Sequence, residues 1–170
     1  MDRLAKALKV IDTISQRTGK LFSFLVLAMV FFEVGETIAR YGFNSPTTWG
    51  WELVMLLYGA LFIMGGAWVL QTEGHVRTDF LYRRLSPKAK AYLDLVLFAA
   101  IFFTFVGVMI WQAGRFAVWA WQVNERTFTM WAPPFYPFRM LLVVAFALLG
   151  VQGLARWIRD LVFVTTGRQI

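Results

Sequence analysis

Four long apolar runs, separated by short polar stretches, dominate the chain. They cover about residues 21–39, 53–70, 92–113 and 137–155, and the second of them contains no charged residue. A bilayer core of about 30 Å needs roughly 20 apolar residues in a helix that crosses it. We therefore expect an all-α membrane protein with four transmembrane helices in a single domain over residues 1–170.

A different pattern precedes the first run. Residues 1–17 carry four apolar side chains at helical spacing, Leu4, Leu8, Ile11 and Ile14, with basic side chains off that stripe. The pattern is typical of an amphipathic interfacial helix in the headgroup plane, and we expect this helix to end near Gly19. The segment lacks the apolar core and the cleavage site of a signal peptide, so the first run should remain in the protein.

Helix boundary signals lie between the runs. Three residues could cap the second span, namely Ser45, Thr47 and Thr48, and the sequence leaves this open. Ser86 followed by Pro87 predicts the start of the third helix. No further proline follows before Trp121, so an uninterrupted helix of about 52 Å is expected, longer than the membrane core.

Small residues in the second span predict close helix packing. Gly59 and Gly66 are seven residues apart and therefore share one helical face, and Gly65 adjoins them. Membrane helices approach one another most closely where such residues meet. We expect this face to be a packing surface.

Composition and charge narrow the class of partner. With 59% hydrophobic and 16% charged residues, the chain is too apolar for a soluble domain. Its net charge of +7 comes from short basic clusters between apolar runs, so we expect membrane lipids and no nucleic acid as the anionic partner. The absence of Cys excludes disulfide scaffolds and thiolate metal sites.

The distribution of basic residues predicts the orientation. Most of the 17 lie in the two termini and the central loop, and only four lie on the other side, Arg40, Arg115, Arg126 and Arg139. The positive-inside rule then places the N-terminus and the C-terminus in the cytoplasm. Five tryptophans form the expected outer aromatic belt, Trp49, Trp51, Trp119, Trp121 and Trp131.

Two acids lie inside the first span. The apolar side chains of this span contribute about −0.3 to −0.6 kcal/mol each to insertion, which outweighs about +2.5 to +3.5 kcal/mol for each of Glu33 and Glu36 at mid-membrane. Glu36 and Arg40 have the i, i+4 spacing of an ion pair. We favour structural pairing or contact with another subunit over an ion relay. Arg139 either reaches the headgroups or pairs with one of these acids.

The central loop holds the only histidine, His75, beside Gly74, Arg77 and Asp79. A haem held by two imidazoles needs a second histidine, and zinc needs further ligands that this chain does not supply. We interpret the loop as a cytoplasmic turn in which Gly74 allows a tight exit from the second span. We expect no cofactor, no metal and no catalytic residue, and therefore no enzyme.

Several stretches, in this order and at this spacing relative to the four runs, carry a family resemblance. They are Arg40, Tyr41, Phe43, Asn44 and Ser45, then Trp49 and Glu52, then Gly65, Gly66 and Ala67, then Gly74, His75, Val76, Arg77 and Asp79, and finally Ser86 and Pro87. Together they resemble the small membrane subunit, Q-type or DctQ-like, of tripartite ATP-independent periplasmic (TRAP) transporters. The chain departs from the family pattern at Trp51, where an acidic residue is common, and at Thr78.

This resemblance implies a non-catalytic scaffold subunit in the bacterial inner membrane. Its partners would be a large multispan permease subunit and a periplasmic solute-binding protein that delivers an organic acid for sodium-coupled uptake. The candidate interface or structural residues are Glu33, Glu36, Arg40, Tyr41, Asn44, Trp49, Glu52, Gly59, Gly65, Gly66, Gly74, His75, Arg77 and Asp79. Two alternatives stay open: a self-sufficient homo-oligomeric transporter or channel, and the membrane anchor of a redox enzyme.

Overall fold

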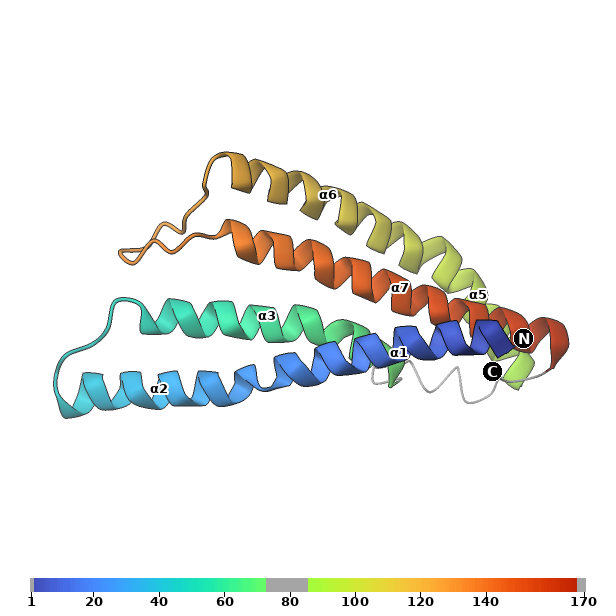
Figure 1. Ribbon diagram of the computed structural model, residues 1–170, viewed down its shortest axis with the longest axis horizontal. Helices are drawn as coiled ribbons and strands as arrows, with labels where there is room; N and C mark the ends of the chain where they lie inside the picture. The colour runs from blue at the N-terminus through green and yellow to red at the C-terminus, as the bar shows by residue number, and fades with distance from the viewer. Residues whose placement is uncertain (1, 73–85, 168–170) are drawn as a thin grey trace.

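The computed structural model describes residues 2–72 and 86–167, and these are almost entirely helical (Figure 1). The helices are α1 (Asp2–Ser23), α2 (Leu25–Gly42), α3 (Gly50–Gln71), α5 (Pro87–Leu97), the π-helical turn η1 (Phe98–Phe102), α6 (Phe103–Gln122) and α7 (Tyr136–Thr166). Four described segments are long and apolar enough to cross a membrane: Arg3–Gly42, Gly50–Gln71, Ala89–Gln122 and Tyr136–Thr166. The predicted all-α architecture with four spans is confirmed.

The helices lie side by side in a row, in the order α2, α3, α7, α6, with each packed on the next (Figure 1). α1 lies end to end with α2, along nearly the same line, and packs mainly on α3, with a smaller contact to α7. In their most apolar windows, the two central helices bury 22% of their residues and the two edge segments only 6%. Because so little is buried within the chain, most of its apolar side chains are left for lipid or for another protein to cover.

The first span is one long rod with a break at Phe24. Next to this break, Phe24 N donates to the Leu21 carbonyl at 3.3 Å and Ser23 Oγ donates to the Lys20 carbonyl at 2.7 Å. The predicted helix end near Gly19 is wrong, because α1 continues through it. A Cβ at Gly19 would lie 2.6 Å from the Trp68 Cβ, so this contact between α1 and α3 has no room for a larger side chain.

The buried face of α1 differs from the predicted apolar stripe. Leu8, Ser15 and Gly19 are buried, whereas Leu4 and Ile14 are exposed. α1 also runs in line with α2 instead of turning across the end of the row (Figure 1). The hydrophobic pattern was misleading here because the face that packs on α3 and α7 is partly polar.

Two predicted helix starts can be compared with the structure. Of the three candidate caps for the second span, Thr47 is the one whose hydroxyl accepts a hydrogen bond from the first residue of α3, Gly50 N, at 3.1 Å. Ser86 caps α5 as predicted, with its Oγ accepting from Ala89 N at 3.3 Å. The helix then continues to Gln122 as expected, but through the unpredicted π-helical turn η1.

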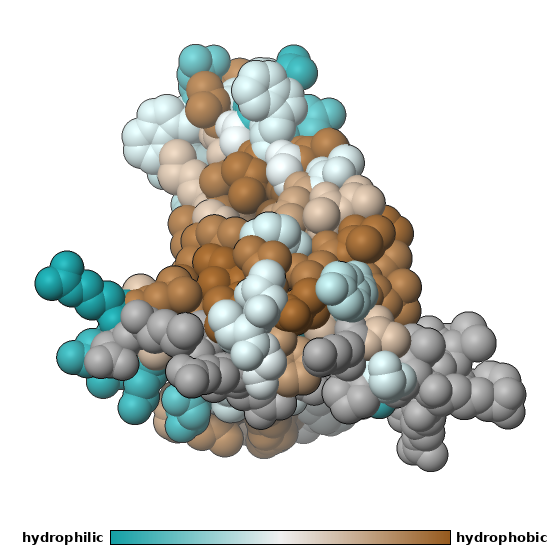
Figure 2. Space-filling view, turned by 90° about the vertical axis from the view of Figure 1, so that its right-hand side faces the viewer, coloured by the Kyte–Doolittle hydropathy of each residue, from teal (hydrophilic) through white to brown (hydrophobic). Residues whose placement is uncertain are grey.

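α7 is longer than its predicted span and ends at Thr166, where Gly167 adopts a left-handed conformation with φ of 70°. Its extension packs against α5, and Trp157 Nε1 donates to the Leu95 carbonyl at 3.1 Å. The end of the row that holds both termini is called here the terminus end; seen from that end, the middle of the visible face is apolar and hydrophilic side chains gather at its lower left (Figure 2). The opposite end, with the α2–α3 and α6–α7 connections, is called the loop end.

Candidate functional site

A carboxylate organises the connection between α2 and α3 at the loop end. Glu36 Oε1 accepts from Arg40 Nη2 at 2.7 Å, which confirms the predicted i, i+4 pair. Glu36 Oε2 accepts from Thr47 N at 3.1 Å and from the Thr47 hydroxyl. With three donors on one buried carboxylate, Glu36 holds the end of α2 to the start of α3 and so has a structural role.

The neighbouring predicted residues take different roles. Asn44 has φ of 49°, a left-handed conformation that Asn tolerates, and it turns the chain after α2. The Trp49 ring lies 6.4 Å from the Trp131 ring, and Glu52 accepts a hydrogen bond from the Thr129 hydroxyl. Trp49 and Glu52 therefore join the α2–α3 hairpin to the α6–α7 connection. Tyr41, in contrast, is highly exposed.

Arg139, at the start of α7, does not take either role predicted for it. Its Nη2 donates to Glu125 Oε1 at 2.7 Å and its Nε donates to Glu125 Oε2, a two-pronged ion pair. The pair with Glu33 or Glu36 is therefore wrong, as is free extension to the headgroups. The hydrogen bond from Arg139 holds the pKa of the Glu125 carboxyl below its ordinary value.

The α6–α7 connection is a well-tied loop. Thr127 N donates to the Pro133 carbonyl oxygen at 3.1 Å, and Phe135 N donates to the Glu125 carbonyl oxygen at 2.8 Å. Ala132 has φ of 45°, a conformation that a residue with a side chain adopts only when its surroundings impose it. The sequence showed an aromatic, proline-bearing segment but not this pairing.

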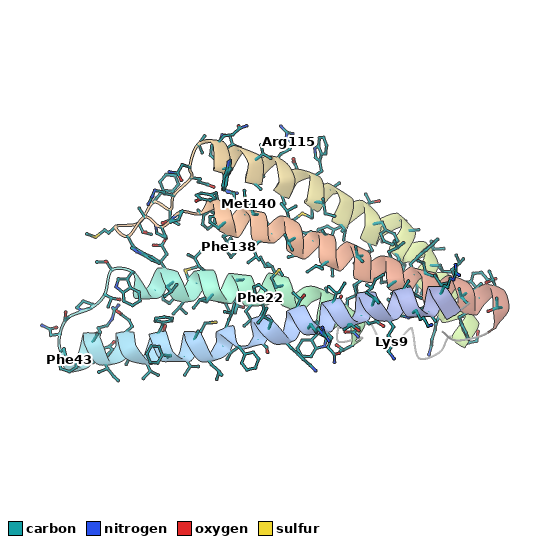
Figure 3. The ribbon with its side chains drawn as sticks, in the orientation of Figure 1. Lys9, Phe22, Phe43, Arg115, Phe138 and Met140 are labelled. Carbon is teal, nitrogen blue, oxygen red and sulfur yellow. The ribbon has the colours of Figure 1, made fainter. Side chains whose placement is uncertain are left out.

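The glycines of α3 divide into two groups. The Phe138 ring of α7 points at Gly59, where an added Cβ would lie 2.7 Å from its Cζ (Figure 3). Gly65 and Gly66 would meet nothing within 4 Å. Gly59 is thus a packing position as predicted, whereas Gly65 and Gly66 take no part in packing between the described helices, and their role as an interface with another subunit stays a prediction. The buried side chains of α3 belong instead to Ala60, Met64, Ala67 and Leu70.

Two grooves flank the contact between α2 and α3, and helical spacing puts their α2 lining residues on opposite sides of Glu36. The first, which we call the polar groove, has a volume of about 280 Å³ and is lined by Glu33, Glu36, Thr37, Arg40, Tyr41 and Trp51. The second, the apolar groove, has about 210 Å³ and is lined by Phe31, Phe32, Gly35, Glu36, Thr47, Trp49 and Gly50. Glu36 lines both grooves, and the other charged residues of the two linings, Glu33 and Arg40, line only the polar groove.

Glu33 is the exposed acid of the polar groove. Its carboxylate makes no hydrogen bond or ion pair with any residue that the structure describes. Arg40, on the same side of α2, is already bonded to Glu36. Glu33 is therefore available to a partner outside this chain.

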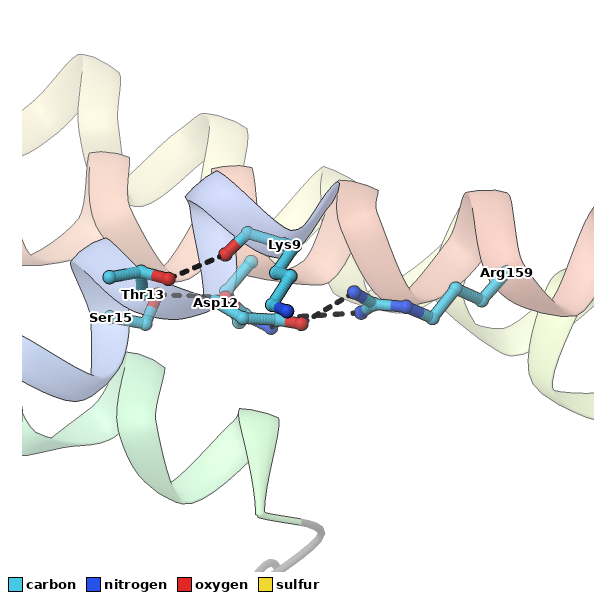
Figure 4. Close-up of polar contacts among 6 residues, drawn as sticks. Lys9, Asp12, Thr13, Ser15 and Arg159 are labelled. Atoms are coloured by element: carbon cyan, nitrogen blue, oxygen red, sulfur yellow. Dashed lines mark hydrogen bonds and ion pairs between the residues drawn. The ribbon is translucent and has the colours of Figure 1, made fainter. Parts of the chain in front are cut away.

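A partly buried polar network at the terminus end was not predicted. Asp12 accepts from Arg159 Nη2 at 2.6 Å and from Gln152 Nε2 at 2.9 Å, and Ser15 Oγ donates to Gln152 Oε1 at 2.7 Å (Figure 4). Asp12 and Ser15 are four and seven residues after the buried Leu8, and this spacing was the available signal. The network ties α1 to α7 beside a cavity of about 560 Å³.

The remaining candidates, Gly74, His75, Arg77 and Asp79, lie outside the described residues. Within residues 2–72 and 86–167, no group of three His, Cys, Asp or Glu side chains could hold a metal ion. The contacts of the described candidates join helices to one another, and Glu33 and Tyr41 instead face outward. This arrangement suits assembly better than chemistry.

Comparison with protein families identifies a match that covers most of the chain. A family model described as "Tripartite ATP-independent periplasmic transporters, DctQ component" matches residues 25–163. The match begins at the first residue of α2 and extends into the last turns of α7, so it includes the loop end and both grooves. No curated protein matches the chain.

Proposed function

The chain belongs to the family of DctQ components of tripartite ATP-independent periplasmic transporters, and from this premise we propose that it is the transporter's non-catalytic scaffold subunit. It supports a large permease subunit in the membrane. That subunit carries an organic acid inward with a sodium gradient, and a periplasmic binding protein delivers the acid.

The observation that best supports a scaffold is the tying of the row at both ends. At the loop end, Glu52 and Thr129 connect α3 to the α6–α7 connection. At the terminus end, Asp12 and Arg159 connect α1 to α7. Helices fixed to one another at both ends cannot easily slide or hinge, which is the property a moving partner needs in the part that stays fixed in the bilayer.

The proposed orientation places the loop end in the periplasm and the terminus end in the cytoplasm. The basic residues concentrated near the two termini support it, because they favour the cytoplasmic side. α1 then extends past the inner hydrocarbon boundary, and its lysines and arginines lie among the anionic headgroups. The amphipathic helix thus reaches the interface as a continuation of the first span.

Reconstitution tests the proposal. The chain, the large membrane subunit and both together are placed in liposomes, and uptake of radiolabelled organic acids is measured with the binding protein and a sodium gradient. Only the liposomes that hold both membrane subunits should accumulate substrate. Uptake or ion conduction by this chain alone would favour a self-sufficient homo-oligomer, and undiminished uptake by the large subunit alone would refute a supporting role.

A further inference from the structure

We propose that the face of α2 and α3 that holds the polar groove is the docking surface for the large membrane subunit, and that a basic side chain of that subunit pairs with Glu33. This inference rests on the proposed scaffold function, because it assigns the contact that such a scaffold requires. It commits to one face of the row and to one charge on the partner.

The two faces of the α2–α3 hairpin differ in chemistry at the same depth. Glu33, Thr37 and Arg40 line one groove, while Phe31, Phe32 and Gly35 line the groove on the other side. Lipid tails cover an apolar groove without loss, whereas charged and hydroxyl groups at that depth need polar partners. The segregation therefore distinguishes a lipid face from a protein face.

On the face that holds the polar groove, a stripe of exposed, mostly apolar side chains continues along α3 away from the loop end. Trp51, Met55, Tyr58 and Phe62 follow one another at helical spacing, and each is more than half exposed. Because Trp51 lines the polar groove, this stripe lies on the same face. α3 is a central helix of the row, so a partner that covers the stripe also spans the groove beside α2.

Two polar groups on this face make no hydrogen bond in the described chain. The Glu33 carboxylate has only the through-space attraction of Arg40, and the Tyr58 hydroxyl makes no hydrogen bond to a described residue. Tyr58 is eight residues into α3, about 12 Å along the helix from its first residue. A lipid tail offers the hydroxyl no acceptor, whereas a protein helix does.

The charge of the groove specifies its partner. Two carboxylates, Glu33 and Glu36, face one guanidinium, that of Arg40, so the groove has a formal net charge of −1 from these residues. Acids within transmembrane segments almost always face the interior of a helix bundle or a water-filled cavity. Glu33 faces outward from this chain, so the interior that it belongs to includes another protein. Arg115 is also exposed on α6 (Figure 3), but its long side chain can extend to the headgroups.

Cross-linking compares the two faces directly. The chain contains no Cys, so Phe62→Cys on the polar face and Phe31→Cys on the apolar face give a matched pair, with native exposures of 72% and 74%. Each variant is coexpressed with the large subunit, labelled in membranes with a photoactivatable maleimide and irradiated. We expect a covalent adduct with the large subunit from Phe62→Cys and not from Phe31→Cys.

Other adducts overturn the inference. An adduct from Phe31→Cys alone, equal adducts from both, a dimer of this chain from Phe62→Cys, or labelled lipid only would each place the large subunit elsewhere. If the wild-type chain still copurifies with the large subunit and supports uptake in those cases, the scaffold function survives and only the docking face is wrong. If the large subunit never copurifies, the scaffold function itself fails.

Charge variants test the pairing separately. Glu33→Lys should reduce recovery of the large subunit by at least about tenfold, because it places a like charge against the partner's base. Glu33→Gln should lose less, and Glu33→Asp should retain part of the interaction. The cross-linking pair still tests the face if the lysine variant fails to fold. Full recovery of a folded Glu33→Lys protein would overturn the proposed pair.

Discussion

The network at the terminus end predicts a specific stability loss for Asp12→Ala. Asp12 accepts hydrogen bonds from Gln152 Nε2 at 2.9 Å and from Arg159 Nη2 at 2.6 Å. Gln152 is only 1% exposed, so its stranded amide should cost about 1–3 kcal/mol. The Arg159 side chain is 28% exposed and can regain water, so its lost ion pair adds only about 0–1 kcal/mol. We expect a total of about 1–4 kcal/mol.

Unfolding in mixed micelles measures this loss. The free energy of unfolding is obtained by titrating detergent-solubilised protein with SDS for Asp12→Ala, Gln152→Leu and the double variant. The double variant should be more stable than the sum of the two single losses predicts, by about 1 kcal/mol, because the leucine removes the stranded amide. Strict additivity, or an Asp12→Ala protein as stable as the wild type, would refute the network as a stabilising unit.

Three further expectations concern packing, pH and capping. Gly19→Leu should destabilise the fold by about 1–3 kcal/mol, because its side chain meets an indole of α3, whereas Gly66→Leu points into open space and should change stability by less than about 0.5 kcal/mol. Since its folded pKa is lowered, Glu125 stabilises the loop end fully above its unfolded pKa of about 4.5, and this stabilisation should be lost as pH falls through the folded value. Glu125→Gln should remove this pH dependence, because a glutamine side chain does not titrate. Ser86→Ala should cost about 1 kcal/mol through loss of the α5 cap.

The same micelle titrations check all three. Equal stability of the two leucine variants would contradict the close approach at Gly19. A stability curve for Glu125→Gln that falls below pH 4.5 as steeply as that of the wild type would contradict the role of the ion pair. For the cap, Ser86→Asp is the control, because it restores an acceptor; a Ser86→Ala protein as stable as Ser86→Asp would show that the hydroxyl contributes nothing.

Local signals in the sequence predicted the features that depend on neighbouring residues. The i, i+4 spacing of Glu36 and Arg40 predicted their ion pair, and Ser86 with Pro87 predicted the start of α5. Both succeed because the groups lie within one helical turn of each other. Arg139 shows the limit, since its partner Glu125 is fourteen residues away in a loop whose shape no local pattern specifies.

The sequence by itself determined that the chain has four membrane-spanning helices, because the length and hydropathy of each run decide whether a segment partitions into the bilayer. Only the tertiary structure decided which faces of those helices meet. It made Gly19 a packing contact instead of a helix end and left Gly66 uncovered. In a membrane both the lipid-facing and the packed side chains are apolar, so hydropathy cannot separate them. The segregation of Glu33 from Phe31 onto opposite faces likewise became visible only once α3 was placed beside α2.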